Sequence, residues 1–480
     1  MRKVAVSIVG AALLFAPRAA FAQEKQDDLQ SDADTILKGD PSGFSSDYVG
    51  RRAAETSYQV QGYVQAYRGA SALVDQAVAQ LVPRLQTSFS YERLSPLTAP
   101  SLGNLVIAQG DVQPGCANCQ SVPFSFPVIL DNWNWTSTLT VPISDYFLRL
   151  NHNYTAATKA REAARYDVGA SETKSAADGK IAFYNWLRGK GLVVIAQLAL
   201  DDQKTHLTDT KNLATVGNAT QVDVLRGETA VAAAELSVVQ ANNALALAEK
   251  QLRIALHVDD LARLASSEPL DTTSLQPVTG TLAAMISEAQ SQRYEVRSID
   301  ANAESLRQQA KVQRNFAYPN LGAFGDVVVA NPNQRIFPLS QTWFPTWDVG
   351  ARISWSPNDV ATAMTQGANL ESRAADLEAQ KQVFREGIAL EVTQAYQSVL
   401  ETDFSLTSTA KQLASAREAV RVARELFRAG RVNSTTLTDA ETDLTRARLQ
   451  LLNARIDART ARVRLEHALG RDNRLVKLPL

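Results

Sequence analysis

Residue types that build catalytic and metal sites are scarce in this chain of 480 residues. It contains two cysteines, three methionines and four histidines, and the histidines are scattered along the chain. No HExxH, Walker loop, GxSxG or GxGxxG pattern occurs. The formal net charge of −1 does not suggest nucleic-acid binding. We therefore expect no enzyme activity, no catalytic residue, no cofactor, no metal site and no nucleic-acid partner.

Long apolar runs are also missing after the first residues. The nearest later candidate is the short run from Leu192 to Leu200, well below the roughly 18 residues of a membrane helix. The start of the chain, in contrast, has the basic, apolar and Ala20-Phe21-Ala22 parts of a secretory signal. We expect a signal peptide over residues 1–22 and an extended polar tether over 23–45. Such an exported chain would enter a bilayer as strands.

The two cysteines, Cys116 and Cys119, form a single CxxC pair. A structural zinc site of this type needs a second pair of ligands, so the pair in an exported protein first indicates a local disulfide. An extracellular metal site for a metal-efflux protein is another interpretation. No methionine or histidine cluster supports it, and the disulfide is the prediction that we retain.

An internal duplication organises the chain. The corresponding segments are Ser57–Val60 and Arg293–Val296, then Pro83 and Pro319, and later Gly217 and Gly430. The first two pairs lie 236 residues apart and the last pair 213 residues apart. The first copy therefore carries about 23 extra residues before Tyr184, and we expect this insert to contain both cysteines.

Each copy predicts the order helix, strand, strand, helix, helix. Opening helices are expected at about Ser46–Leu81 and Leu282–Phe316, each stopped by a proline. Strands are expected at about 84–93, 132–142, 320–330 and 346–356, and long helices at about 150–214, 221–256, 358–428 and 434–469. The two structural repeats then span 46–256 and 282–471, with a linker at 257–281 and a tail at 472–480.

The predicted strands alternate apolar and polar residues with a period of two. In one of them Trp133, Trp135 and Leu139 share a face, and Asn134 and Thr136 share the other. A soluble sheet with one face on a core would give the same alternation. However, two hairpins are few for so long a chain, and lipid tolerates no open sheet edge. Together with the export signal, the pattern favours a membrane barrel that several chains close.

The long helices are expected to pair as two antiparallel hairpins with packing like that of a coiled coil. Gly217 and Gly430 interrupt the helical pattern near the middle of each pair. Glycine adopts a positive φ at little cost, which suits a tight reversal. The predicted tips are Val216-Gly217-Asn218 and Ala429-Gly430-Arg431.

These features together resemble the TolC-like outer-membrane efflux family. The most specific matching pieces are Tyr318-Pro319-Asn320-Leu321, Val141-Pro142-Ile143-Ser144-Asp145 and Arg428-Ala429-Gly430. The resemblance covers about Gly50 to Arg471. Two departures from the family pattern are Trp355-Ser356-Pro357, where the proline comes late, and Tyr294, where a proline is common.

The resemblance implies a mainly α fold with a β-barrel portion. A homotrimer would build one twelve-stranded barrel in outer-membrane lipid and a long α-helical periplasmic tunnel. The implied function is the passive exit duct of a tripartite efflux or type I secretion system in a Gram-negative cell. The implied partners are a periplasmic adaptor (membrane fusion) protein and an inner-membrane transporter. A soluble periplasmic coiled-coil scaffold or adhesin is the alternative interpretation.

The same resemblance assigns roles to residues near the predicted tips. Adaptor-facing positions would be Val216, Gly217, Asn218, Ala429, Gly430 and Arg431, which are otherwise simple turn residues. Charged side chains would close the periplasmic end of the tunnel, and the candidates on one helical face are Glu418, Arg421, Glu425 and Arg428. A solvated outer face held by ion pairs is the alternative interpretation of this charge pattern.

Overall fold

The computed structural model describes residues 40, 42–97, 103–108, 119–123, 128–259, 264–268, 270, 275 and 277–472. The predicted signal peptide lies outside the described residues. The same holds for most of the predicted tether, of which only residues 40 and 42–45 are described, and for residues 473–480 of the predicted tail.

The chain divides into two compact units, and both repeats contribute to each. The helical unit comprises Met1–Tyr67, Ala164–Ile299 and Gln380–Leu480 in their described parts, and the strand unit comprises Arg68–Ala163 and Asp300–Ala379. Corresponding segments of the two repeats therefore fold together in each unit.

Helices account for most of the described residues, which confirms the mainly α fold. The first repeat contains α2 (Ser46–Thr56), α3 (Tyr58–Ala79), α4 (Ile143–Asp145), α5 (Asn151–Thr215) and α6 (Gln221–Leu256). The second contains α7 (Leu282–Gln292), α8 (Tyr294–Arg314), α9 (Asp359–Arg428) and α10 (Ser434–Leu469). A π-helical turn occupies Tyr146–Leu150 and a 3-10 turn occupies Asn315–Ala317.

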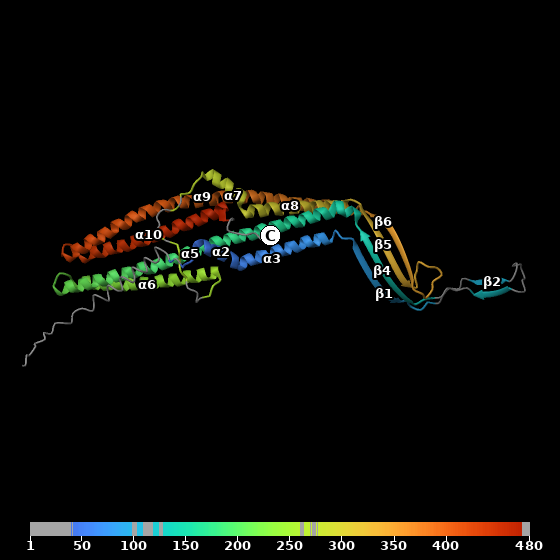
Figure 1. Ribbon diagram of the computed structural model, residues 1–480, viewed down its shortest axis with the longest axis horizontal. Coiled ribbons are helices and arrows are strands. Elements are labelled where there is room, and N and C mark those ends of the chain that lie inside the picture. Colours follow the sequence, from blue (N-terminus) through green and yellow to red (C-terminus); the bar gives the residue numbers. More distant parts are fainter. Residues whose placement is uncertain are drawn as a thin grey trace, which may run out of the picture. The chain divides into compact units, whose positions relative to one another are not determined.

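Four long strands form one antiparallel sheet in the strand unit (Figure 1). They are β1 (Arg84–Arg93), β4 (Asp131–Val141), β5 (Asn320–Asn331) and β6 (Phe344–Ser354), in the order β1-β4-β5-β6. The pairing of β4 with β5 joins the strands of the two repeats. The alternation in the sequence therefore predicted four strands but not the single sheet that they share.

A second, two-stranded sheet lies in the insert of the first repeat. Its strands are β2 (Asn104–Ala108) and β3 (Cys119–Pro123), which pair antiparallel. Neither strand was expected, because each is only five residues long and shows no clear alternation. Cys119 begins β3, whereas Cys116 lies outside the described residues, so the disulfide between them stays a prediction.

The prediction of one continuous opening helix in each repeat was wrong. The first breaks at Ser57 and the second at Arg293, and both residues have extended backbone angles, with ψ of 124° and 132°. The Ser57 hydroxyl accepts a hydrogen bond from the Val60 N–H and so caps α3. Arg293 is buried and its guanidinium pairs with Glu295 and Glu391, which holds the corresponding break.

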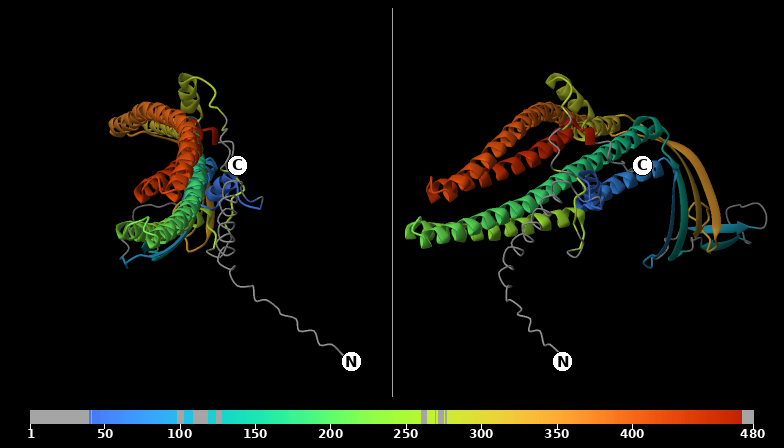
Figure 2. Two further views of the ribbon diagram at one scale, coloured as in Figure 1. Left: turned by 90° about the vertical axis from the view of Figure 1, so that its left-hand side faces the viewer. Right: turned by 60° about the vertical axis from the view of Figure 1, so that its left-hand side comes forward.

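The long helices pair as predicted, with α6 beside α5 and α10 beside α9 (Figure 2). Alanine and leucine are frequent in α6 and α10, arginine is also frequent in α10, and all three residues have high helix propensity. Helix α10 is buried along most of its length, whereas the buried residues of α6 lie mainly near its two ends. Side-chain packing like that of a coiled coil is therefore continuous along α10 but not along α6.

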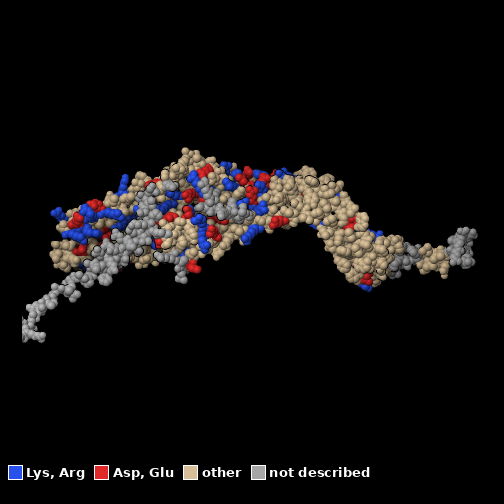
Figure 3. Space-filling model, in the orientation of Figure 1, with Lys and Arg blue, Asp and Glu red and all other residues tan. Residues whose placement is uncertain are grey.

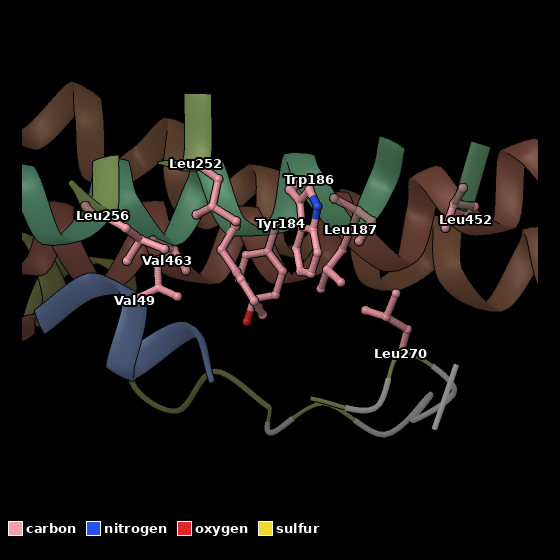
Figure 4. Packing of buried hydrophobic residues seen from close by; sticks show 12 residues of the cluster. Val49, Tyr184, Trp186, Leu187, Leu252, Leu256, Leu270, Leu452 and Val463 are labelled. Atoms are coloured by element: carbon pink, nitrogen blue, oxygen red, sulfur yellow. The ribbon is translucent and has the colours of Figure 1, made fainter. Parts of the chain in front are cut away.

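The largest apolar cluster holds the helical unit together (Figure 4). It joins Phe183, Trp186 and Leu187 of α5 to Leu252 of α6 and Ile456 of α10, and all five are at most 2% exposed. A second cluster joins α7, α8, α9 and α10. Because α10 contributes to both clusters, it is the central packing element of this unit.

Candidate functional site

The four-stranded sheet has one apolar and one polar face, because directly paired residues lie on the same face. The apolar face carries Leu85, Phe89, Tyr91, Trp133, Trp135, Leu139, Val327, Val329, Trp347, Val349 and Ile353. The polar face carries Gln86, Ser88, Ser90, Asn134, Thr136, Thr138, Thr140, Asp326, Asp348 and Arg352. The alternation read separately in each strand is thus in phase across all four.

Four apolar residues, Phe324, Val328, Ala330 and Phe344, interrupt the polar face. The guanidinium of Arg352 lies 5.1 Å from the centre of the Phe324 ring, so a charged group covers this aromatic side chain. On the same face Arg335 pairs with Asp348, whose neighbour across the strands is Asp326. Polar side chains therefore still outnumber the four apolar exceptions on this face.

The apolar face has no cover within the described chain. Trp347 and Val349 are each 74% exposed and Leu85 is 68% exposed. Figure 3 shows few charged side chains over the strands on the displayed side. Among the described strands, β1 and β6 each pair along one edge only. A sheet that exposes a large apolar surface and two open edges requires other molecules to cover them.

The first hairpin tip is a tight turn between α5 and α6. Gly217 has a φ of +78°, and the Asn218 N–H donates to the Leu213 carbonyl oxygen at 2.9 Å, as in a Schellman turn. Thr220 and Asp223 then form a capping box that starts α6. Val216 is 68% exposed at the tip.

The second tip repeats this geometry between α9 and α10. Gly430 has a φ of +69°, and the Arg431 N–H donates to the Leu426 carbonyl oxygen at 2.9 Å. The Asn433 side chain accepts from the Thr436 N–H and caps α10. Both turns are therefore defined by backbone hydrogen bonds and caps, and both leave their central residues exposed.

The charged candidates near the second tip form a ladder of ion pairs along α9. Arg421 pairs with Glu418 at 2.6 Å and with Glu425 at 2.8 Å, and all three side chains are more than half exposed. These pairs raise the pKa of Arg421 and lower that of Glu418. Arg428 instead reaches Asp209 of α5 at 3.5 Å. In the single chain this ladder is solvated, as the alternative interpretation requires.

A buried polar network behind the tips was missed by sequence reasoning. Glu441 of α10 is 3% exposed and accepts from Gln203 of α5 and from Arg424 of α9, each at 3.2 Å. Asp202 of α5 lies between Arg424 and Arg448, at 3.5 and 3.3 Å. The network thus ties three helices together.

Two titratable groups in this region have displaced pKa values. Burial raises the pKa of Glu441 to about 7 although Arg424 opposes the shift. Burial also lowers the pKa of His206, which is 3% exposed and bonds to the Ser434 hydroxyl at 3.0 Å. In the sequence His206 was one of four scattered histidines. Within the described residues, no group of three or more potential metal ligands is placed to hold an ion.

A family model described as outer membrane efflux protein matches residues 49–256 and 285–471. The match covers both repeats and omits only the linker between them and the two ends. A comparison with curated proteins finds no match.

Solved structures with the same fold are outer-membrane channels. Structures of CusC, described in terms of transmembrane channel formation, match with a TM-score of 0.72 at 14% identity over 89% of this chain and 92% of that one. The CmeC outer membrane channel of Campylobacter jejuni gives 0.71 at 13% identity over 88% and 85%. The open state of the MtrE outer membrane channel of Neisseria gonorrhoeae gives 0.70 at 16% identity over 90% and 89%.

Proposed function

Since this chain belongs to the outer membrane efflux protein family and lies in the outer membrane, we propose that it is the exit duct of a tripartite efflux or type I secretion system. An inner-membrane transporter supplies the energy, and a periplasmic adaptor connects it to this chain. The duct is passive, and its relatives are channels rather than enzymes. The observation that carries the proposal is the two-faced sheet with open edges.

Closure of the sheet by identical copies satisfies all of its exposed groups. The β6 edge of one copy pairs with the β1 edge of the next, so three copies give a twelve-stranded barrel. Closure also removes the unpaired backbone groups that lipid does not tolerate. The apolar face then meets lipid, and the polar face lines water.

Two exposed apolar stripes on the long helices support the same homotrimer. On α6 the stripe consists of Val222, Leu225, Leu236, Val239, Leu247 and Ile254, and on α9 it consists of Val383, Leu390, Leu400, Phe404 and Val422. Each set falls within about 100° of arc on its helix. Burial of α6 of one copy against α9 of the next would cover both stripes.

Helix α6 also has the length and mean hydropathy of a membrane span, although only 6% of its most apolar segment is buried. A search for consecutive apolar residues misses it because polar residues interrupt the sequence. We assign this exposed surface to contact between copies. Two observations support that assignment. The apolar residues keep to one stripe, and beside that stripe Glu235 and Glu228 of α6 pair with Lys204 and Lys211 of α5.

The hairpin tips are the proposed contact with the adaptor. Val216, Gly217 and Asn218 form one contact, and Ala429, Gly430 and Arg431 form the other. Their exposure and rigid turn geometry support this role. The ion-paired ladder of Glu418, Arg421, Glu425 and Arg428 is the proposed aperture. If it lines the aperture in the trimer, replacement of Glu418 and Glu425 by alanine changes ion selectivity, whereas unchanged conductance assigns the ladder to the outer surface.

The test is the conductance of the purified protein in planar bilayers, combined with its mass in detergent. A trimer that forms small, long-lived channels is the expected result. A soluble monomer that never inserts contradicts the duct and favours the periplasmic scaffold instead. Capture of the adaptor by the intact protein, and its loss on removal of the tip turns, tests the assembly separately.

A further inference from the structure

A small cavity in the helical unit combines an apolar interior with a basic rim. It has a volume of about 160 Å³ and lies between α5, α9 and α10. Val194 and Leu198 of α5 and Leu413 of α9 contribute apolar surface. Arg417 of α9 and Arg448 and Arg455 of α10 contribute the charge. The cavity belongs to neither the tips nor the sheet, and the proposed function assigns it no role.

Close helix packing sets the apolar walls of the cavity. A Cβ atom at Gly191 of α5 would come within 2.6 Å of the Leu452 side chain of α10, so the two helices approach closely there. Both residues also line the cavity. Leu413, Leu451 and Leu452 are at most 8% exposed. The cavity is therefore a preformed space, which lowers the cost of ordering a bound molecule.

Basic residues outnumber acidic ones along the hairpin that carries the three arginines of the cavity. Between Lys411 and Arg471 the chain has thirteen basic and seven acidic residues, and this surplus favours anions. Figure 3 shows basic side chains gathered over the α9–α10 hairpin. Asp202 pairs with Arg448 and also with Arg424, which in turn pairs with Glu441. Arg448 therefore shares its carboxylate with a second guanidinium group and can bind a further anion.

We propose that this cavity binds a small amphipathic organic anion, a carboxylate or sulfonate on one aromatic ring or a short alkyl chain. An apolar cavity of roughly 150 Å³ accommodates benzene, so the interior here fits a body of that size. The guanidinium groups of Arg417, Arg448 and Arg455 bind the anionic group, because their planar donors suit carboxylate and sulfonate oxygens. The bound anion links α5, α9 and α10.

The probe for the test is 4-fluorobenzenesulfonate, titrated into the purified full-length protein in a neutral detergent and followed by ¹⁹F NMR. Saturable binding is expected, with at least tenfold weaker binding of the uncharged 4-fluorobenzenesulfonamide. Because the anion binds only the folded protein, it should also raise the thermal midpoint. Equal binding of both compounds, or no saturable binding of the sulfonate, contradicts the proposal.

Variants test the charged part and the apolar part of the site separately. The double variant Arg417→Gln/Arg455→Gln removes two rim charges and should weaken sulfonate binding by about tenfold or more. Arg464→Gln is the matched control, since Arg464 lies exposed on α10 and does not line the cavity. Val194→Phe keeps every charge but fills the apolar interior, and it should also abolish binding. If both pocket variants bind as the unsubstituted protein does, the cavity is not the site.

The binding measurement does not depend on channel activity. A protein that binds the sulfonate but does not conduct leaves this inference standing and contradicts the duct. A conducting trimer that shows no saturable binding contradicts this inference and leaves the duct standing. Should the double variant fail to fold, the comparison of sulfonate with sulfonamide and the Val194→Phe variant still decide the question.

Discussion

At the scale of a single residue, the burial of Glu441 makes the stability of the fold depend on pH. Its pKa is about 7 in the folded chain, against an ordinary value of 4.5. A carboxyl group whose pKa is raised by folding stabilises the fold below its unfolded pKa, and that contribution is lost as the pH rises through the folded pKa. The window here is therefore pH 4.5 to about 7. As the pH rises across this window, the free energy of unfolding should fall by roughly 3 kcal/mol because of this group alone.

The variant Glu441→Gln should remove this dependence. Glutamine stays neutral, so the variant should be more stable than the unsubstituted protein at pH 8 by an amount of the order of 2–3 kcal/mol, and similar to it near pH 4.5. Urea unfolding in detergent at the two pH values measures the difference. A variant that is less stable at pH 8 would mean that the contacts with Arg424 and Gln203 outweigh the cost of burying the charge.

Residues such as Glu441 and His206 show what the sequence withholds at this scale. Helical periodicity identifies apolar stripes, but it does not say which polar residues become buried when two hairpins pack. Glu441 is buried because α5 and α9 both cover α10 at that level. The surface ladder around Arg421, by contrast, follows directly from the spacing of three and four residues between opposite charges.

The tip turns belong to the scale of elements, and Gly430 provides the test. Its φ of +69° is left-handed, and a Cβ atom there would meet nothing within 4 Å. Gly430→Val should therefore act through backbone strain alone, at a cost of about 1–2 kcal/mol. Gly430→Asn is the matched control, because asparagine tolerates this conformation better.

Hydrogen exchange of the backbone amides beside the turn measures the effect. The valine variant should exchange faster at the ends of α9 and α10 and bind the adaptor less well, whereas the asparagine variant should differ little from the unsubstituted protein. Equal exchange in both variants would mean that the turn conformation is not constrained by φ at this position.

Adjacent residues on β1 test the two faces of the sheet. Phe89 is 63% exposed on the apolar face, and Ser88 lies on the polar face. Phe89→Lys places a charge in lipid, which costs about 2–4 kcal/mol near the bilayer midplane, and should reduce insertion. Ser88→Lys should insert normally and shift the ion selectivity of the channel toward anions. Membrane fractionation and single-channel recording measure these outcomes, and the reverse pattern would exchange the two faces.

Sequence patterns predicted some elements better than others, for physical reasons. Strand positions were predictable because successive side chains of a strand point to opposite faces of the sheet, so apolar and polar residues alternate with a period of two. The breaks at Ser57 and Arg293 were not, since no proline or glycine marks them and contacts distant in sequence, such as that of Arg293 with Glu391, hold the second one. The pairing of β4 with β5 was equally inaccessible, because it joins residues almost 200 positions apart.

Contact between copies is a property of the whole molecule. Phe404 is 77% exposed within the α9 stripe, so Phe404→Asp should place a charge in the proposed contact with α6 of the next copy. The trimer should then dissociate at lower detergent or denaturant concentration. Phe404→Leu keeps an apolar side chain and serves as the control. Native mass spectrometry measures both, and a fully stable Phe404→Asp trimer would remove α9 from the interface.

The unpaired borders of the four-stranded sheet also bear on how the protein is made. A strand border with free amide and carbonyl groups accepts any extended segment, including one from an unrelated chain. A newly exported copy is therefore prone to aggregate until its free strand edges pair with those of other copies of the same chain. Barrel closure and membrane entry should accordingly be a single concentration-dependent event. A cell that makes too few copies would then accumulate single chains, which its quality-control proteases degrade, rather than partly assembled channels.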